Sequence, residues 1–126
     1  MIVGVVIETD RGYLCQLRDD KPGIKFPGLW GFFGGHSDHG ESPDAALRRE
    51  LIEELEYEPE KLEPFFHIGD FVLFRCFATE VDIRAMRLHE GVEMRSISID
   101  DLGRYEFIPA CRTLLLTLAH VKNGQL

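Results

Sequence analysis

The order of hydrophobic and polar positions along the chain predicts strands and helices in one mixed domain. Residues 2–7 are almost uninterruptedly apolar and β-branched, which is typical of a buried strand. Residues 13–18 alternate between two faces, and the turn signal at residues 10–12 joins the two segments into a predicted hairpin. Residues 71–78 and 95–99 predict two further strands.

Two other segments have the spacing of amphipathic helices. Residues 109–121 place their aliphatic side chains on one face. The other helix follows Ser42, a favourable N-cap, has Pro43 at its first position and ends before Pro59. Strands that alternate with two helices favour an α/β fold in which the apolar stripes form the core.

Length and composition limit the class of protein. The chain has 126 residues, of which 44% are hydrophobic, so we expect one domain over residues 1–126. No apolar run approaches the roughly 20 residues of a membrane span, and no basic segment precedes the apolar N-terminus, so we expect neither a membrane anchor nor a signal peptide. Three widely spaced cysteines, an odd number, favour the reducing cytoplasm over a disulfide scaffold.

The chain is strongly acidic. With 22 acidic and 14 basic residues its formal net charge is −8, so it has no electrostatic reason to bind nucleic acid. If it acts on an anionic substrate, it needs a further source of positive charge, and a divalent cation is the obvious one.

One helix combines an apolar stripe with a row of carboxylates. Glu50, Glu53 and Glu54 fall within an arc of about 100° on the helix that follows Ser42. Carboxylates this close repel, so without a cation at least one should have a raised pKa. Such oxygen ligands suit Mg²⁺ or Mn²⁺, and Gly35, before the helix, lets a backbone carbonyl approach a metal closely. Taken alone, glutamates at this spacing are more often a solvated helix face.

A longer motif includes these glutamates. Gly35 is followed after five residues by Glu41, and after seven more by residues 49–54, Arg-Glu-Leu-Ile-Glu-Glu. This pattern resembles the signature box of the Nudix hydrolases, the MutT-like family. Residues 14–18, 29–31, 90–91 and 100–102 are similar to segments that precede and follow the box in that family. The resemblance therefore covers most of the chain, with the box at residues 35–57.

The end of the box departs from the family pattern. Glu56 stands where the family has glycine, and Tyr57 occupies the next, usually aliphatic, position. A glycine there allows a left-handed exit from the helix, and another residue costs about 1 kcal/mol. Glu56 also lies at the negative end of the helix dipole. We expect an atypical exit from the helix and unaltered metal ligands.

The resemblance implies a fold and a reaction. The family fold is an α/β/α sandwich, with a mixed β-sheet between the box helix and the C-terminal helix. Its members are metal-dependent hydrolases that cleave a nucleoside diphosphate linked to another group, by attack of water on a phosphorus of the pyrophosphate. The implied cofactor is Mg²⁺, with Mn²⁺ as the other candidate, and the implied partner is a small-molecule nucleotide.

The resemblance also assigns roles to residues of this chain. The expected metal ligands are the carbonyl of Gly35 and the carboxylates of Glu50, Glu53, Glu54 and Glu90. The expected catalytic residues are Glu50, Arg49 and Glu53. Glu50 is the expected general base, with Glu90, and after it Glu93, as alternatives, although a surface charge is an equally open interpretation of Glu90. Arg49 is expected either to pair with Glu53 one turn further along the helix or to fold back and hold Glu41, which would fix the loop on the helix.

The expected substrate-binding residues lie on both sides of the box loop. They are Arg18, Lys25, Trp30, Gly34 and His36. A surface cation is the alternative interpretation of Arg18, and core packing is the alternative for Trp30. His36 is favoured over His39 because it follows Gly35 directly.

The range of candidate substrates is reduced only by excluding some subclasses of the family. Residues that mark the ADP-ribose, dinucleoside-polyphosphate and coenzyme A subclasses are absent after the box, which leaves nucleoside triphosphates and nucleotide sugars. A non-catalytic, nucleotide-sensing Nudix domain is the alternative function, disfavoured because every box glutamate is present. An enzyme that acts on RNA is disfavoured by the acidic balance. A homodimer through Phe65, Phe66 or Phe71 stays open, since these are equally good core residues.

Overall fold

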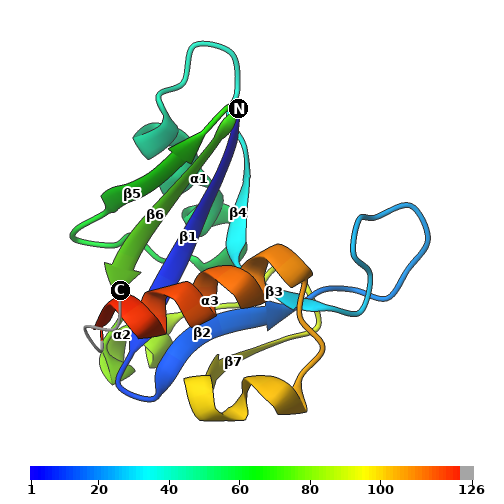
Figure 1. The fold of residues 1–126 in the computed structure, drawn as a ribbon. Coiled ribbons are helices and arrows are strands. Elements are labelled where there is room, and N and C mark those ends of the chain that lie inside the picture. The colour runs from blue at the N-terminus through cyan, green and yellow to red at the C-terminus, as the bar shows by residue number, and fades with distance from the viewer. Residues whose placement is uncertain (123–126) are drawn as a thin grey trace.

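One mixed β-sheet organises the molecule, which the computed structural model describes over residues 1–122 (Figure 1). The strands are β1 (Ile2–Thr9), β2 (Gly12–Leu17), β3 (Trp30–Gly31), β4 (Phe33–His36), β5 (Glu63–Ile68), β6 (Phe71–Phe77) and β7 (Glu93–Ile97). The helices are α1 (Pro43–Leu55), α2 (Glu80–Ala85) and α3 (Pro109–Lys122), with a 3₁₀ helix η1 (Ile99–Arg104).

Strand β1 lies at the centre of the sheet. It pairs in parallel with β6 along one edge. Along the other edge it pairs antiparallel with β4 through residues 2–5 and with β2 through residues 7–9. Two strands therefore share one edge of β1, and β4 ends beside α1 with its two glycines.

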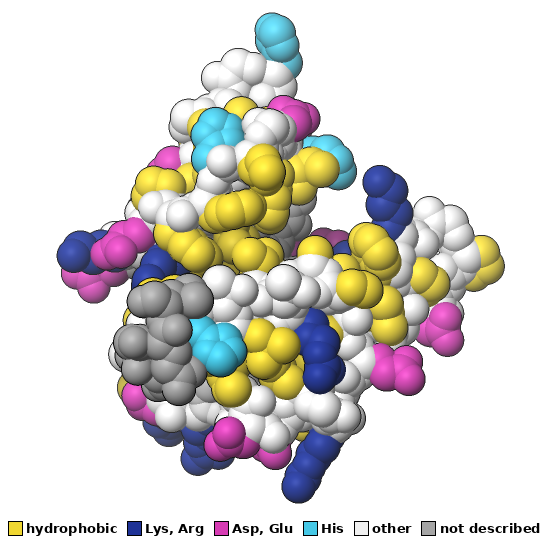
Figure 2. Space-filling model, viewed as in Figure 1, with side chains coloured by type: hydrophobic (Ala, Val, Ile, Leu, Met, Phe, Trp, Pro, Cys, Tyr) yellow, Lys and Arg dark blue, Asp and Glu magenta, His cyan; other side chains and the backbone are white. Residues whose placement is uncertain are grey.

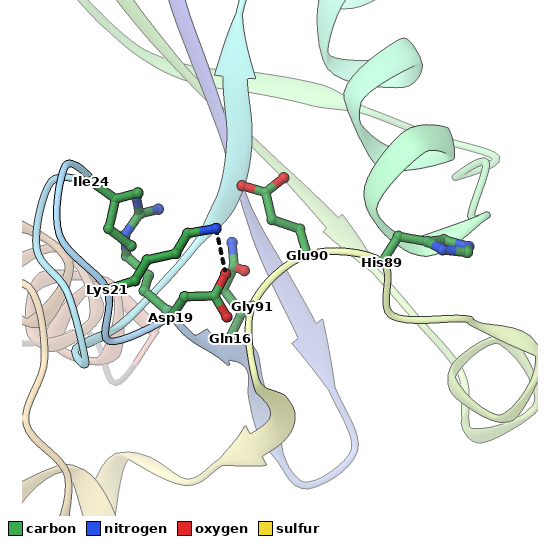
Figure 3. A pocket seen from close by; sticks show the side chains of 8 residues that line it. Gln16, Asp19, Lys21, Ile24, His89, Glu90 and Gly91 are labelled. Atoms are coloured by element: carbon green, nitrogen blue, oxygen red, sulfur yellow. Dashed lines mark ion pairs between the residues drawn. The ribbon is translucent and has the colours of Figure 1, made fainter.

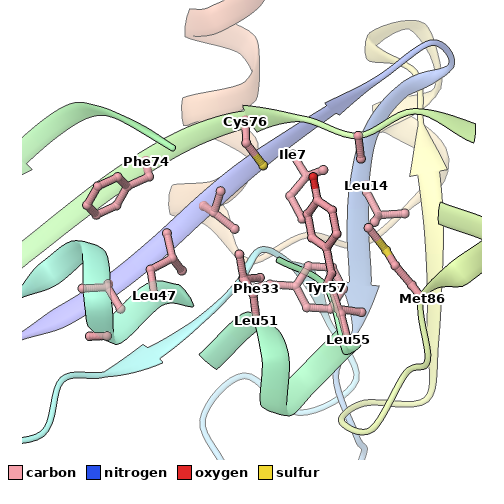
Figure 4. Packing of buried hydrophobic residues seen from close by; sticks show 14 of the residues in the cluster. Ile7, Leu14, Phe33, Leu47, Leu51, Leu55, Tyr57, Phe74, Cys76 and Met86 are labelled. Carbon is pink, nitrogen blue, oxygen red and sulfur yellow. The ribbon is translucent and has the colours of Figure 1, made fainter. Parts of the chain in front are cut away.

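The two long helices cover opposite faces of the sheet, as the α/β/α sandwich requires (Figure 1). On the α1 side, Leu47, Leu51 and Leu55 are fully buried among the side chains of β1, β4 and β6 (Figure 4). On the α3 side, Leu115 and Leu118 pack into a second cluster. The expected fold is thus confirmed, and the apolar stripes of both helices form the core.

Helix α1 begins and ends where the sequence predicts. Ser42 is the N-cap, and its hydroxyl accepts a hydrogen bond from the Ala45 N–H at 3.2 Å. Glu56 ends the helix in the left-handed conformation, with φ 52° and ψ 38°, and its N–H donates to the Ile52 carbonyl at 2.9 Å. Tyr57, which follows, is buried in the core on the α1 side. The expected atypical exit is therefore not found, because Glu56 adopts the same left-handed conformation that a glycine would adopt there.

Other elements differ from the sequence prediction. Strands β3, β4 and β5 and helix α2 were not predicted. The strand expected at residues 95–99 instead runs from Glu93 to Ile97, because the Ser98 hydroxyl accepts the Asp100 N–H at 3.1 Å and begins η1.

Strand β5 forms one edge of the sheet, and all six of its residues are exposed. Phe65 and Phe66 are therefore not core residues, whereas Phe71 is half-buried. Figure 2 shows hydrophobic side chains gathered over β5, β6 and β1, beyond the part of the sheet that α3 covers. Cys15, Cys76 and Cys111 are free thiols. No helix within residues 1–122 is long and apolar enough to cross a membrane.

Candidate functional site

The site is built where β4 meets α1. The Gly34 N–H donates to the Glu54 carboxylate at 3.4 Å. A methyl group on Gly34 would lie 2.2 Å from the Val3 carbonyl oxygen, at a φ of +152°. On Gly35 it would lie 2.5 Å from the carboxyl carbon of Glu50. The backbone of β1 therefore leaves no room for a side chain at Gly34, and the Glu50 side chain of α1 leaves none at Gly35.

Glu54 is the most constrained of the box glutamates. It is only 2% exposed, and its Oε2 atom has no hydrogen-bond partner. Burial, followed by the negative charge of Glu90 and the proximity of Glu50, raises the pKa of Glu54 from an ordinary value of 4.5 to about 9. A buried carboxyl that faces two other carboxylates needs either a proton or a cation, which is the electrostatic condition of a metal site.

Arg49 connects the box loop to the helix. Its guanidinium binds both carboxylate oxygens of Glu41, at 2.8 and 3.0 Å, and donates to the His36 carbonyl at 2.9 Å. It also contacts Glu50 at 3.1 Å and Glu53 at 3.3 Å. The Arg49 hydrogen bonds, with one from the Asp38 N–H, lower the pKa of Glu41 to about 2. Both of the alternative contacts expected for Arg49, with Glu41 and with Glu53, are present.

The box glutamates do not all point the same way. Glu50 and Glu54 face one another, whereas the side chain of Glu53 is 57% exposed and paired with Arg49. Within residues 1–122, no group of three or more His, Cys, Asp or Glu side chains is arranged so that it could hold a metal ion. Two glutamates of the row are thus held together here, and the metal contact of Glu53 stays a prediction.

A cavity of about 330 Å³ is lined by a further carboxylate, that of Glu90 (Figure 3). Its walls come from β2, from the loop between β2 and β3, and from the loop between α2 and β7. The lining residues are Gln16, Arg18, Asp19, Lys21, Ile24, His89, Glu90 and Gly91. Glu90, which sequence reasoning left as an open candidate, lies in this cavity wall and acts electrostatically on Glu54.

Of the residues predicted to bind the substrate, some line the cavity and others do not. Arg18 lines the cavity, and its Nε donates to the Lys25 carbonyl at 2.9 Å, so it also holds the loop. The Lys25 side chain is exposed and not part of the lining. Trp30 is 7% exposed and packs edge-on against Tyr105, in agreement with the core interpretation. His36 is exposed beside Gly35.

Sequence reasoning missed several residues of the cavity wall. Gln16 is 2% exposed, and its amide nitrogen donates to the Phe32 carbonyl at 3.1 Å. A polar residue in the middle of a predicted strand was the signal that could have found it. His89 and Ile24 have no comparable signal, because only the folding of two separate loops brings them to the cavity.

Comparisons with known proteins identify the family of the chain. A family model described as the NUDIX domain matches residues 1–111. The nucleoside triphosphatase NudI of Escherichia coli O139:H28 is 47% identical over 55 residues, which cover 43% of this chain and 38% of that protein. The match thus spans well under half of that relative.

Solved structures match over nearly the whole chain. A structure from a study of MutT of Aliivibrio salmonicida and Vibrio cholerae has a TM-score of 0.74 and 27% identity, over 92% of this chain and 93% of that one. The NUDIX domain of Shewanella oneidensis NrtR, complexed with ADP ribose, has the same TM-score of 0.74 at 20% identity, over 94% and 85% of the two chains. At that identity the second likeness concerns the fold alone.

Proposed function

The chain belongs to the Nudix family, and from that premise we propose that it is a divalent-metal-dependent hydrolase that cleaves a phosphoanhydride bond in a small nucleotide. One observation carries the proposal. The buried Glu54 has an oxygen without a partner and faces Glu50 and Glu90, at a β4 glycine that leaves room for Glu50. This arrangement of oxygen donors suits Mg²⁺ or Mn²⁺.

The donors that would hold the cation come from α1 and β4. They are the carboxylates of Glu50 and Glu54 and the carbonyl of Gly35, with Glu53 and Glu90 as further ligands. When bound, the cation would polarise the phosphoryl oxygens and neutralise the charge that develops on them.

The proposed general base is Glu50, which takes a proton from the attacking water. Arg49 binds the Oε1 atom of Glu50 at 3.1 Å and so fixes the orientation of that carboxylate. Because Arg49 is also held by Glu41 and the His36 carbonyl, its guanidinium cannot swing away from Glu50 without breaking the box loop contacts. Arg49 is thus a positioning residue in this scheme.

The substrate phosphates would enter through the cavity. Arg18 and Lys21 line it and supply positive charge to an otherwise acidic protein. Lys21 is only loosely paired, with its Nζ 3.8 Å from an Asp19 oxygen, so it is available to a phosphate. We favour a nucleoside triphosphate, in line with the description of NudI as a nucleoside triphosphatase, and keep nucleotide sugars as the alternative substrates.

A substrate panel tests the proposal. Nucleoside triphosphates and nucleotide sugars are incubated with Mg²⁺ or Mn²⁺, and the products are identified. We expect Glu50→Gln and Glu54→Gln to abolish most turnover with the fold intact, and the exposed Glu58→Gln to serve as the matched control. Metal-independent turnover, or near-normal turnover in either site variant, would contradict the proposal, and binding without turnover would indicate a nucleotide-sensing domain.

A further inference from the structure

The residue that ends α1 does more than a glycine could do there. The backbone of Glu56 closes the helix by donating to the Ile52 carbonyl at 2.9 Å, and a glycine in the same left-handed conformation would make that bond at lower conformational cost. What glutamate adds at this position, compared with glycine, is its side chain. That side chain reaches the loop between α2 and β7.

Three contacts join the end of α1 to this loop. The Arg87 N–H donates to the Leu55 carbonyl at 2.9 Å, and the His89 N–H donates to the Glu54 carbonyl at 2.8 Å. The third contact joins side chains 33 residues apart, with the Oε2 atom of Glu56 2.5 Å from the Nε2 atom of His89. Only this third contact depends on having a glutamate at position 56.

The residue after His89 is Glu90, which lines the cavity and acts electrostatically on Glu54 of the proposed metal site. Figure 3 shows the side chains of His89 and Glu90 on opposite sides of the loop, with Glu90 directed into the cavity. No ion pair within residues 1–122 holds the Glu90 carboxylate. Its position therefore depends on how the backbone on either side of it is anchored.

The far side of the loop is anchored against β2. The Val92 N–H donates to the Leu17 carbonyl at 2.9 Å. Gly91 has a φ of +83°, and a methyl group there would lie 2.8 Å from both the Leu17 carbonyl and the Gln16 amide oxygen. The near side is anchored by its contacts with the end of α1 and by Met86 and Leu88, which pack against the core. Glu90 thus sits between one tight anchor on β2 and one that includes the Glu56–His89 pair.

We propose that Glu56 is a positioning residue, which holds the loop through His89 so that the Glu90 carboxylate stays next to Glu50 and Glu54. The metal-binding consequence rests on the proposed function, whereas the contact between Glu56 and His89 does not. The side chains of Glu56 and His89 are about half-exposed, at 54% and 52%. An exposed pair of this kind adds little to folding stability, so its effect is on the placement of the loop.

The substitution Glu56→Gly separates these two effects. It relieves the left-handed backbone and removes the side-chain contact, so the melting temperature rises while the loop loosens. We expect faster amide hydrogen exchange at residues 88–91 in the metal-free protein. We also expect Mn²⁺ affinity to fall about three- to fivefold, which is the most that the loss of an exposed pair can remove. In turnover, kcat should fall more than KM changes.

Further variants test whether the two side chains act together. His89→Ala should give the same losses, and Glu56→Gly combined with His89→Ala should be no worse than either alone, because both remove one contact. Glu56→Lys combined with His89→Glu restores an ion pair of reversed polarity and should recover Mn²⁺ affinity. Asp101→Asn, which breaks the exposed pair with Arg104 at 3.7 Å, is the matched control and should change none of these quantities.

The outcomes distinguish this inference from the proposed function. If Glu56→Gly raises the melting temperature and leaves amide exchange and Mn²⁺ affinity unchanged, Glu56 does not position the loop. The same conclusion follows if the two single substitutions have additive effects. If the wild-type protein hydrolyses no nucleotide, the proposed function fails, while the exchange rates and Mn²⁺ affinities still decide the role of Glu56.

Discussion

At the scale of single residues, Gly34 and Gly35 are adjacent but constrained by different neighbours. The three atoms nearest to a methyl group on Gly35 all belong to the carboxyl group of Glu50, at 2.5 and 2.6 Å, and Gly35 has no positive φ. We therefore predict that Gly35→Ala folds but displaces the Glu50 carboxylate, with turnover reduced by about 100-fold, the scale of a misplaced catalytic group. Steady-state kinetics and circular dichroism of the same sample measure the two effects.

Gly34→Ala is the matched control. The added methyl group would lie 2.2 Å from the Val3 carbonyl oxygen, which is backbone and cannot turn aside. This substitution should lower the melting temperature strongly, as expected where both φ and space are unsuitable. If Gly35→Ala destabilised the protein as much as Gly34→Ala, the distinction between a structural and a functional glycine would be wrong.

The buried Glu54 predicts how stability depends on pH. Its pKa is raised to about 9 in the folded protein, from an ordinary value of 4.5. Between these values the folded state keeps a proton that the unfolded state releases, so stability falls as pH rises, with a slope of up to about 1.4 kcal/mol per pH unit from this group. Glu54→Gln has no proton to lose at this position. The free energy of unfolding of Glu54→Gln, relative to that of the wild type, should therefore be higher at pH 8 than at pH 5.

Urea denaturation in the presence of a chelator measures this difference. The free energy of unfolding of the wild type and of Glu54→Gln is compared at pH 5 and pH 8. Glu58→Gln, an exposed change on the same segment, should follow the wild type at both values. Parallel profiles for the wild type and Glu54→Gln would show that Glu54 titrates normally.

At the scale of elements, one arginine joins the loop before α1 to the helix itself. Arg49→Lys keeps the charge but cannot bind both oxygens of Glu41 and the His36 carbonyl at once. We predict faster hydrogen exchange of the Asp38 amide, which donates to Glu41 at 2.7 Å, and a turnover at least about tenfold lower.

The neighbouring arginine of α1 is the control for that change. Arg48 binds Asp44 at 2.9 Å and the Pro59 carbonyl at 2.7 Å, away from the box carboxylates. Arg48→Lys should therefore leave turnover and the exchange of the Asp38 amide unchanged. If both variants lost turnover to the same extent, the effect of Arg49→Lys would come from a general loss of stability in α1 and not from its contacts with the box loop.

The elements also show what can be predicted from the sequence. Helix α1 was predictable because its signals are local: Ser42 caps it, Pro43 begins it and its leucines recur on one face. Strand β5 was not, because all its residues are exposed and it has no alternation. Helix α2 has a capping box of Thr79 and Asp82 but no buried residue, so its only signal lay at one end.

The residues of the site also divide into those that the sequence predicted and those that it could not. The Arg49–Glu41 contact and the grouping of Glu50 with Glu54 follow from spacing within one continuous segment. The role of Glu90 could not be decided, because the loop that carries it is placed by hydrogen bonds to the end of α1 and to β2. Trp30 was ambiguous for a related reason, since its burial depends on Tyr105, far along the chain.

At the scale of the whole molecule, a bound cation should couple the site to global stability. A ligand that binds only the folded state raises the free energy of unfolding by about 2.7 kcal/mol at a concentration 100 times its Kd. At the proposed site the cation replaces the proton on Glu54, whose pKa is raised to about 9, so it binds more weakly as pH falls. We therefore predict that Mn²⁺ raises the melting temperature more at pH 8.5 than at pH 6.

The net charge of −8 provides the competing explanation, because any cation that screens this charge also stabilises the fold. Sodium chloride at matched ionic strength measures that contribution, which does not depend on Glu54. The part of the Mn²⁺ effect that exceeds it should be lost in Glu54→Gln and kept in Glu58→Gln. If Glu54→Gln kept the full effect, or if the effect did not grow with pH, Mn²⁺ would be acting on the surface charge and the carboxylates of α1 would not be its site.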